Sequence, residues 1–389
     1  MTISPKRVFR FLASYGVTVV LLLLLSVLTF LGTLEQVDQG LYAVQKKYFE
    51  SLFLVHGFFG VVPVPLPGAF LLMIFLAVNL TCGAILRAPK GWRHAGILLT
   101  HAGILVLLAG SFVTFKFSER GHITLYEGDV WDHFVSYDAW EIAMAPEGAG
   151  GPVTERIIPG KDFTHMGRED AVPFHAGDLP FDLVLRGYTP NARPVPAAAA
   201  KTPPDTVVDG YLLEDQDLAA DAEQNIPGVY VTLAEKATET VHRGILWGAA
   251  KSPWTLDVGG QRWTLDLRRQ VSSLPFAVRL DKFTRELYPG SNIPKAFKSD
   301  VTTIDGDIQQ QIQISMNAPL RYKGYTLYQA SWGPPNAGPG DRLYSSLAAV
   351  RNPAEQFPLY ACCVICFGLL IHFCQKLVGY LYTEARKRS

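Results

Sequence analysis

The sequence lacks cysteine over most of its length. Only five cysteines occur in 389 residues, and none lies between Ser118 and Gln356. Disulfides cannot hold this long segment, so a buried core has to stabilise it, and about 240 residues are enough to form one. The five cysteines lie in apolar runs: Cys82, Cys362, Cys363, Cys366 and Cys374.

Three cysteines near the start of the last apolar run, Cys362, Cys363 and Cys366, invite a thiol-exchange interpretation. Helix geometry argues against it, because residues four apart have Cβ atoms about 5 to 6 Å apart and a disulfide needs about 3.5 to 4.5 Å. Thiol reactivity also requires a polar, accessible setting. We interpret these cysteines as packing residues in lipid.

The chain also lacks an excess of either charge. Lys plus Arg and Asp plus Glu both number 35, which excludes nucleic-acid or polyanion binding driven by bulk charge. We find no nucleophile and base pair, no metal-ligand spacing and no phosphate-binding loop, so a self-sufficient enzyme is disfavoured and no catalytic residue is expected.

Long apolar runs, in contrast, are abundant. The mean hydropathy is +0.15 despite 26 prolines and 34 glycines. Four runs reach the roughly 20 residues that cross a hydrocarbon core of about 30 Å. They predict membrane spans at residues 11–34, 69–86, 95–117 and 357–382. A cleaved signal peptide is the alternative for the first run, which is however too long and lacks a convincing cleavage site.

Basic residues predict the orientation of these spans, because Lys and Arg concentrate in short cytoplasmic segments. Lys46 and Lys47 lie in the longer first loop and count against the assignment, although three acidic residues accompany them. We expect cytoplasmic termini and a cytoplasmic turn at residues 87–94. The basic flanks are Lys6, Arg7 and Arg10; Arg87, Lys90 and Arg93; and Arg386, Lys387 and Arg388.

The predicted organisation follows from the spans. Residues 1–34 form the first span, 69–117 a helical hairpin, and 357–389 the last span with its basic tail. Residues 35–68 form an external loop, in which the apolar stretch 52–59 predicts a short helix at the membrane surface or packed on the external domain.

The external domain, residues 118–356, is predicted to be β-rich. Alternation and β-branched or aromatic residues favour strands at 262–267, 308–315 and 325–332, with glycine turns at 258–261 and 304–307. Leu179-Pro180-Phe181 and Leu274-Pro275-Phe276 begin segments with matching apolar offsets. They suggest two related β units, divided by the low-complexity stretch 194–204 and an acidic run at 214–223; a recurring strand-entry pattern is the alternative.

Histidines in the spans are the main candidates for chemistry. His101 lies about seven residues inside the third span, where an ionisable group is costly without a partner. It is a functional candidate, and the alternative is a neutral imidazole bonded to a neighbouring helix. His372, in the last span, would reach a similar depth and complete a bis-imidazole haem site, or would point to the surface beside Lys376.

Other histidines are weaker candidates. His94 precedes His101 by two helical turns, about 10 Å, so the two cannot ligate one iron, and His94 is an interfacial residue or part of a haem route. His56, His122 and His133 lie near span ends on the external side, where surface histidines are the plain alternative to ligands.

Short motifs occur in a distinctive order along the chain. Together with three early spans, a large external domain and one final span, they resemble the ResB-like proteins of the system II cytochrome c biogenesis pathway. The motifs are Leu31-Gly32-Thr33, His101 to Gly103, Leu274-Pro275-Phe276, Tyr288-Pro289-Gly290-Ser291, Ser299-Asp300-Val301, Met316-Asn317-Ala318-Pro319-Leu320 and Tyr328-Gln329-Ala330-Ser331-Trp332.

The resemblance implies a haem-handling subunit in the bacterial inner (cytoplasmic) membrane. In that family a histidine of the third span takes part in binding b-type haem in transit, and by position it corresponds to His101. The implied partners are a CcsA-like membrane protein, apocytochrome c outside and a thioredoxin-like thiol reductant. The tryptophan-rich motif of the CcsA-like partner is absent, and Trp332-Gly333-Pro334-Pro335 is no substitute. The chain is therefore expected to be a non-catalytic or co-catalytic subunit.

A membrane-anchored β domain that acts as a scaffold or sensor without haem is the competing interpretation. Bound haem that disappears when His101 is replaced distinguishes the two hypotheses.

Overall fold

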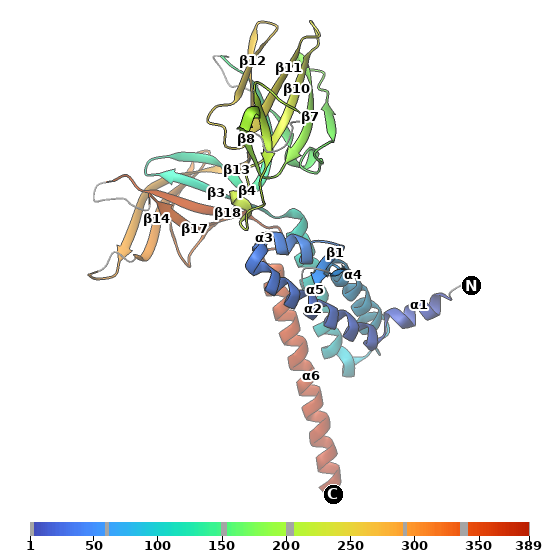
Figure 1. Ribbon diagram of the computed structural model, residues 1–389. Coiled ribbons are helices and arrows are strands. Elements are labelled where there is room, and N and C mark those ends of the chain that lie inside the picture. The colour runs from blue at the N-terminus through green and yellow to red at the C-terminus, as the bar shows by residue number, and fades with distance from the viewer. Residues whose placement is uncertain are drawn as a thin grey trace. The chain divides into compact units, whose positions relative to one another are not determined.

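The computed structural model describes residues 4–58, 62–148, 154–199, 206–290, 294–334 and 341–388. The chain divides into two units. Unit 1, Met1–Ser118 with Asn352–Ser389, holds the helices, and unit 2, Glu119–Arg351, holds most of the strands. Figure 1 labels the elements of both units.

Among its described residues, unit 1 contains four helices that are long and apolar enough to cross a membrane. This confirms the four predicted spans, three before the β-rich segment and one after it. In Figure 1 the C-terminal part of the last helix extends beyond the other helices of the unit. The helices are α1 (Pro5–Leu12), α2 (Tyr15–Gln39), α3 (Leu41–Val44), α4 (Ala69–Leu80), α5 (Ala95–Phe117) and α6 (Phe357–Arg388), and the π-helical turns Gln45–Phe49 and Thr81–Leu86 follow α3 and α4.

The first span begins later than predicted. The apolar run from residue 11 is divided at Ala13 and Ser14, where α1 ends and α2 begins. The Ser14 hydroxyl accepts a hydrogen bond from the Gly16 amide at 3.2 Å and caps α2, which apolarity alone cannot indicate.

The predicted surface helix at 52–59 is wrong within the described residues. Strands β1 (Phe53–Phe58) and β2 (Val62–Pro67) form an antiparallel hairpin there, and Phe59 lies outside the described residues. Three prolines alternate with valine and leucine in β2, and proline cannot continue a helix but is tolerated in an edge strand. The helical turns of this loop lie earlier, at Leu41–Phe49.

Helices α5 and α6 pack through glycines spaced seven residues apart. Gly96, Gly103 and Gly110 are all buried. An added Cβ would lie 2.5 Å from the His372 backbone nitrogen at Gly96 and 2.7 Å from Ile365 at Gly103. Residue numbers rise on α5 as they fall on α6, so the helices are antiparallel. Small residues allow this close approach of backbones, as at many helix interfaces in membranes.

A buried amide joins α2 to α4. Asn79 is 4 % exposed; its Oδ1 accepts a hydrogen bond from Thr18 at 2.6 Å, and its Nδ2 donates to the Leu12 carbonyl at 2.6 Å. Nδ2 also donates to the Ser14 carbonyl at 3.1 Å. The amide thus satisfies backbone groups left open where α1 ends.

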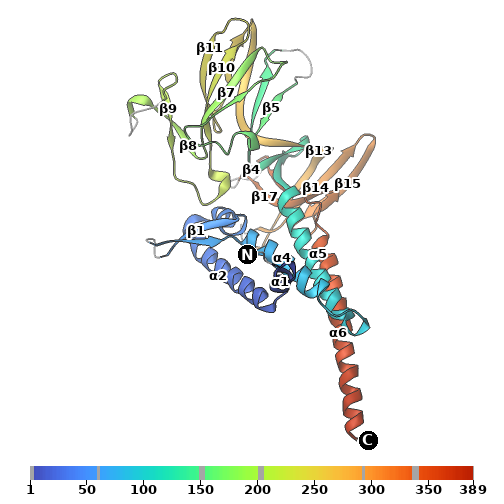
Figure 2. The same ribbon diagram turned by 90° about the vertical axis from the view of Figure 1, so that its right-hand side faces the viewer.

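Unit 2 is an antiparallel β structure, as predicted. A ten-stranded sheet has the order β15-β14-β13-β4-β3-β18-β17-β16, with β12 on β13 and β5 on β4, and a four-stranded sheet has the order β11-β10-β7-β6. Figure 2 shows the β8 and β9 ribbon beside the layer of β7, β10 and β11. The strands are β3 (Glu119–Tyr126), β4 (Val130–Pro146), β5 (Arg156–Pro159), β6 (Ala171–Phe174), β7 (Phe181–Thr189), β8 (Ala192–Pro196), β9 (Tyr211–Asp215), β10 (Gly228–Glu235), β11 (Val241–Trp247), β12 (Trp254–Val258), β13 (Gln261–Leu287), β14 (Pro294–Asp305), β15 (Ile308–Ser315), β16 (Leu320–Tyr322), β17 (Tyr325–Gly333) and β18 (Tyr344–Arg351).

Predicted turns explain two of the strand pairings. Gly259 and Gly260, both with positive φ, connect β12 to β13, so that Val258 faces Gln261. The second hairpin turns at Gly306 and Asp307, with Asp305 opposite Ile308. Part of the predicted low-complexity divider, residues 200–204, lies outside the described residues.

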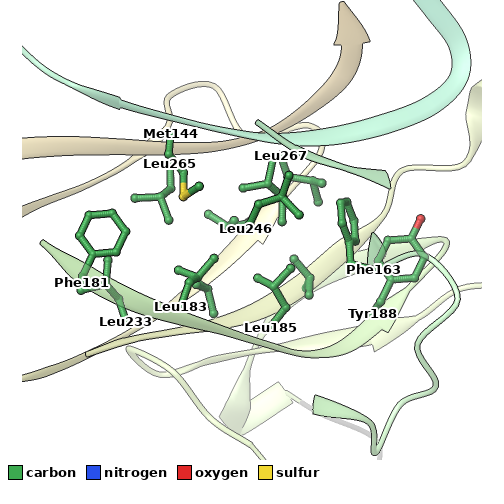
Figure 3. Packing of buried hydrophobic residues seen from close by; sticks show 14 of the residues in the cluster. Met144, Phe163, Phe181, Leu183, Leu185, Tyr188, Leu233, Leu246, Leu265 and Leu267 are labelled. Carbon is green, nitrogen blue, oxygen red and sulfur yellow. The ribbon is translucent and has the colours of Figure 1, made fainter. Parts of the chain in front are cut away.

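Two hydrophobic cores lie in unit 2, and the long strands β4 and β13 contribute to both. In the first, leucines of β7 face Leu265 and Leu267 of β13 and Met144 of β4 (Figure 3). The second contains Val278 and Leu280 of β13. Leu179 and Phe181 belong to the first core and Leu274 and Phe276 to the second, at matching offsets. An internal repeat remains a prediction.

We expect Gly96→Ala to reduce the stability of unit 1 by about 1 to 3 kcal/mol, because the new methyl group meets backbone that cannot move aside easily. The measurement is the unfolding midpoint of the purified protein in detergent. Gly379→Ala is the control, since nothing lies within 4 Å of a Cβ there; its effect should stay within about 0.5 kcal/mol. Equal midpoints for both variants would contradict the close packing.

Candidate functional site

His101 lies in the first third of α5, and a hydrogen bond determines its tautomer. Its Nδ1 lies 2.7 Å from the carbonyl oxygen of Ile97. A carbonyl oxygen can only accept, so Nδ1 carries the proton and donates. Nε2 then keeps its lone pair, which is the form of imidazole that binds a metal.

The glycine seam places His101 on the side of α5 away from α6. His101 comes five residues after Gly96, and at about 100° per residue it lies about 140° around the helix from the seam. Residues on the same face by helical spacing are apolar. The face therefore fits a large apolar ligand with a metal at its centre. The residues are Leu98, Leu105, Leu108 and Phe112.

His372 does not meet His101 in the structure. Its backbone nitrogen packs on Gly96, whereas His101 is five residues further along α5, about 7.5 Å in level. The His372 ring contacts Phe373, with centroids 5.8 Å apart.

His94 ends the 3₁₀ turn Trp92–His94, just before α5. Gln375 of α6 donates a hydrogen bond to the Trp92 carbonyl at 2.6 Å, which attaches this turn to the last helix. His94 therefore lies nearer to the level of His372 than to that of His101.

A polar cluster after α2 was missed in the sequence analysis. The Glu35 carboxylate accepts hydrogen bonds from Tyr48 Oη and from Lys47 Nζ, the latter at 2.5 Å. His56 Nδ1 lies 2.5 Å from Tyr48 Oη. Tyr48 is 0 % exposed, and burial followed by the contact with Glu35 raises the pKa of its hydroxyl well above the usual value.

One feature of the sequence could have indicated this cluster: the first loop and the end of the first span contain acidic residues, among them Glu35, that can pair with Lys47. Lys46 and Lys47 conflict with the topology that the other basic residues predict, and acidic residues accompany them in the sequence. The pairing of Lys47 with Glu35 supplies the partner for that charge. Glu35 and His56 lie 21 positions apart, so no local sequence pattern indicated that they are close in space.

The histidines at the start of unit 2 have other surroundings. His122 of β3 stacks on Tyr137, with centroids 5.3 Å apart, and its buried Nδ1 has no hydrogen-bond partner within the described part of the chain. Burial lowers the pKa of His122, Arg269 lowers it further, and Glu223 opposes them. His133 stacks on Trp131 and contacts the exposed Asp132 at 2.9 Å.

An aromatic cluster lies on the strands that carry most of the predicted motifs. Trp332 of β17 stacks on Phe283 of β13, with centroids 6.4 Å apart, and tilts against Phe297 of β14 at 6.1 Å. The Arg285 guanidinium lies 4.5 Å from the Trp332 ring centroid. Cation and ring attract one another. Phe283 is 5 % exposed and belongs to the second hydrophobic core, against which the half-buried Phe297 and Trp332 pack.

The described residues contain no group of three or more His, Cys, Asp or Glu side chains arranged to hold a metal ion. The cysteines are all free, and the four on α6 are exposed in the isolated chain.

Comparison with known proteins places this chain beside cytochrome c biogenesis proteins. Residues 258–341 match the ResB-like family, which confirms the resemblance for the segment that contains most of the predicted motifs. A cytochrome c biogenesis protein CcsB of a Picosynechococcus species is 40% identical over 89 residues, 22% of this chain and 18% of that protein. The CcsB of Synechococcus elongatus is 30% identical over 100 residues, 23% and 22% of the two chains. The match thus spans about a fifth of the length of these relatives.

We expect unit 2 to lose stability in mildly acidic solution partly through His122. Its pKa is lowered on folding, so the unfolded chain binds more protons just below pH 6.5 and stability falls as the pH decreases through that window. His122→Phe should lose less of its thermal midpoint between pH 7 and pH 5 than the wild type. His165→Phe, at an exposed histidine, is the control. Parallel pH curves for all three proteins would refute the assignment.

Proposed function

We propose that this chain is a membrane subunit of a cytochrome c biogenesis machine, which holds haem in the membrane through His101 and acts with a CcsA-like partner. The match of residues 258–341 to the ResB-like family and to CcsB proteins supports the pathway. The observation that carries the haem role is the His101 imidazole, whose Nδ1 is bonded within its own helix and whose Nε2 is free to bind iron.

His101 binds the cargo and orients it. The Ile97 carbonyl fixes the imidazole in one tautomer, so no proton has to be lost from Nε2 when iron is ligated. The apolar face around it excludes water from the iron. Because an ionisable side chain inside a membrane is costly, a ligand role accounts for its presence better than packing alone.

A histidine of the CcsA-like partner is the second axial ligand in this proposal. Opposite axial nitrogens lie about 4 Å apart, twice a metal to nitrogen distance of about 2 Å. His372 packs beside Gly96, five residues before His101 along α5, and this position does not favour it as the second ligand. His94 is an interfacial residue near the same end of α5, and at most lines a haem route.

Unit 2 is proposed to receive apocytochrome c on the outer side. Its sequence has no cysteine, so it cannot form mixed disulfides with the Cys-x-x-Cys-His client or with a thioredoxin-like reductant. The half-buried Phe297 and Trp332, with Arg285 beside the Trp332 ring, lie within the segment that matches the ResB-like family, and we assign them to contact with client or haem.

The proposed location is the bacterial inner membrane, with both termini and the turn at Arg87–Arg93 in the cytoplasm. Basic residues flank these points, and Glu35 pairs with Lys47 in the loop assigned to the outside. Unit 2 is then extracytoplasmic.

Reporter fusions test this orientation. Alkaline phosphatase inserted at the β10–β11 turn, beside the exposed Glu239, should be active, because that enzyme needs an oxidising compartment. The same enzyme fused after α6 should be inactive, while a green fluorescent protein at that end should fluoresce. Phosphatase activity at the C-terminal end would overturn the orientation.

Covalent haem in a reporter c-type cytochrome tests the haem role. In cells that also carry a CcsA-like partner, we expect His101→Ala to lower haem attachment by at least about tenfold, because it removes a ligand. Immunoblots establish that the variant is present in the membrane. Ser111→Ala is the matched control, since this hydroxyl also bonds a carbonyl of α5, at 3.0 Å, but is no iron ligand.

The competing hypothesis of a scaffold without haem makes a different forecast. Haem attachment unchanged by His101→Ala, but lost without the chain, would support the scaffold. Attachment unchanged in cells without the chain would reject a role in cytochrome c assembly altogether.

A further inference from the structure

His56 has the features of a second iron ligand, separate from His101. Its side chain is 15 % exposed, as is that of Glu35, and Tyr48 between them is 0 % exposed. We propose that His56 is an axial ligand for haem iron, held ready by Glu35 and Tyr48. This inference rests on the proposed function in its choice of ligand.

The hydrogen bonds of the cluster fix the imidazole. The Glu35 carboxylate is paired with the Lys47 ammonium at 2.5 Å and can only accept. Tyr48 has a single hydroxyl proton, which it donates to Glu35. The Tyr48 oxygen must therefore accept from His56 Nδ1 at 2.5 Å, so that Nδ1 is protonated and Nε2 carries the lone pair.

Nε2 of His56 is left for an external partner. No hydrogen bond to it is found in the part of the chain that the structure describes, and it is not among the buried polar atoms without partners. Burying a carboxylate, a phenol and an imidazole together costs free energy. Glu35 acts on the imidazole through the Tyr48 hydroxyl. A hydrogen-bonded partner of this kind fixes the orientation of a ligating histidine, so the arrangement has a clear use at a metal site.

The surroundings of His56 suit a porphyrin better than a bare metal ion. The ring meets Phe58 edge to face, with centroids 4.7 Å apart, and faces Val64 across the β1–β2 hairpin. The described residues contain no group of three or more His, Cys, Asp or Glu side chains here, as a bare ion would require.

The two imidazoles belong to opposite ends of unit 1. Glu35, Tyr48 and His56 follow or end α2, whereas His101 lies 16 residues before the end of α5, about 24 Å along that helix. In the proposed orientation His101 would hold haem in the inner part of the membrane and His56 would hold it at the outer surface. We therefore expect two separate haem sites, each with its own absorption spectrum.

Other carboxylate-bound histidines lack these features. His242 Nε2 contacts Glu235 at 2.7 Å, but this pair belongs to the β10–β11 hairpin, beside Thr238 and Thr240. The Asp132 that contacts His133 is 75 % exposed. His242 therefore serves as the matched control, an imidazole oriented by a carboxylate without an apolar site.

The test titrates ferric haem into the full chain in lipid nanodiscs and follows the Soret band and the electron paramagnetic resonance of imidazole-bound iron. We expect His101→Ala to retain an imidazole-ligated haem. Adding His56→Ala should weaken that binding by at least about tenfold, and adding Tyr48→Phe by about 10- to 100-fold, the usual effect of losing a partner of a ligand. Adding His242→Ala should change nothing.

Three results would count against the proposal in distinguishable ways. If haem binds the wild type but not the His101→Ala variant, His56 is not a ligand, and the proposed function is unaffected. Residual binding that His56→Ala does not weaken also rejects it. A wild type without imidazole-ligated haem rejects both. To exclude misfolding, free imidazole should restore the Soret band of the His101→Ala, His56→Gly protein.

Discussion

The close contact of α5 with α6 determines what the rest of the helical unit can do. Three glycines at seven-residue intervals bring the two backbones together, which leaves no room for side chains along that line. A ligand therefore has to bind on another face of α5, and His101 occupies such a face. Unit 2 separates α5 from α6 in the sequence. The contact between these helices therefore joins the two separate chain segments that make up unit 1.

Two groups of polar contacts in unit 1 lie at the two ends of α2. Asn79 satisfies carbonyl groups at the break between α1 and α2, and Glu35 gathers Lys47, Tyr48 and His56 at the other end of α2. A polar group in an apolar setting is costly unless it is bonded, so each of these contacts limits how the helix can move. Both ends of α2 are fixed in this way.

The sequence predicted the elements well and their contacts less well. Apolar length is a local property, and it indicated all four spans and the position of His101. The break at Ser14 depends on a cap, and the β1–β2 hairpin on alternating prolines that an apolarity argument does not weigh. The contacts of His372 and His56 depend on residues far away in the sequence, Gly96 and Glu35, which no local pattern connects.

Strand β13 contributes to both cores of unit 2 through one continuous backbone of 27 residues. It pairs with β4 on both sides of the irregular stretch between Ser273 and Val278. A pull on either half is therefore carried into the other by covalent bonds and by a shared ladder of hydrogen bonds. Any force applied to one half of β13 therefore acts on both cores.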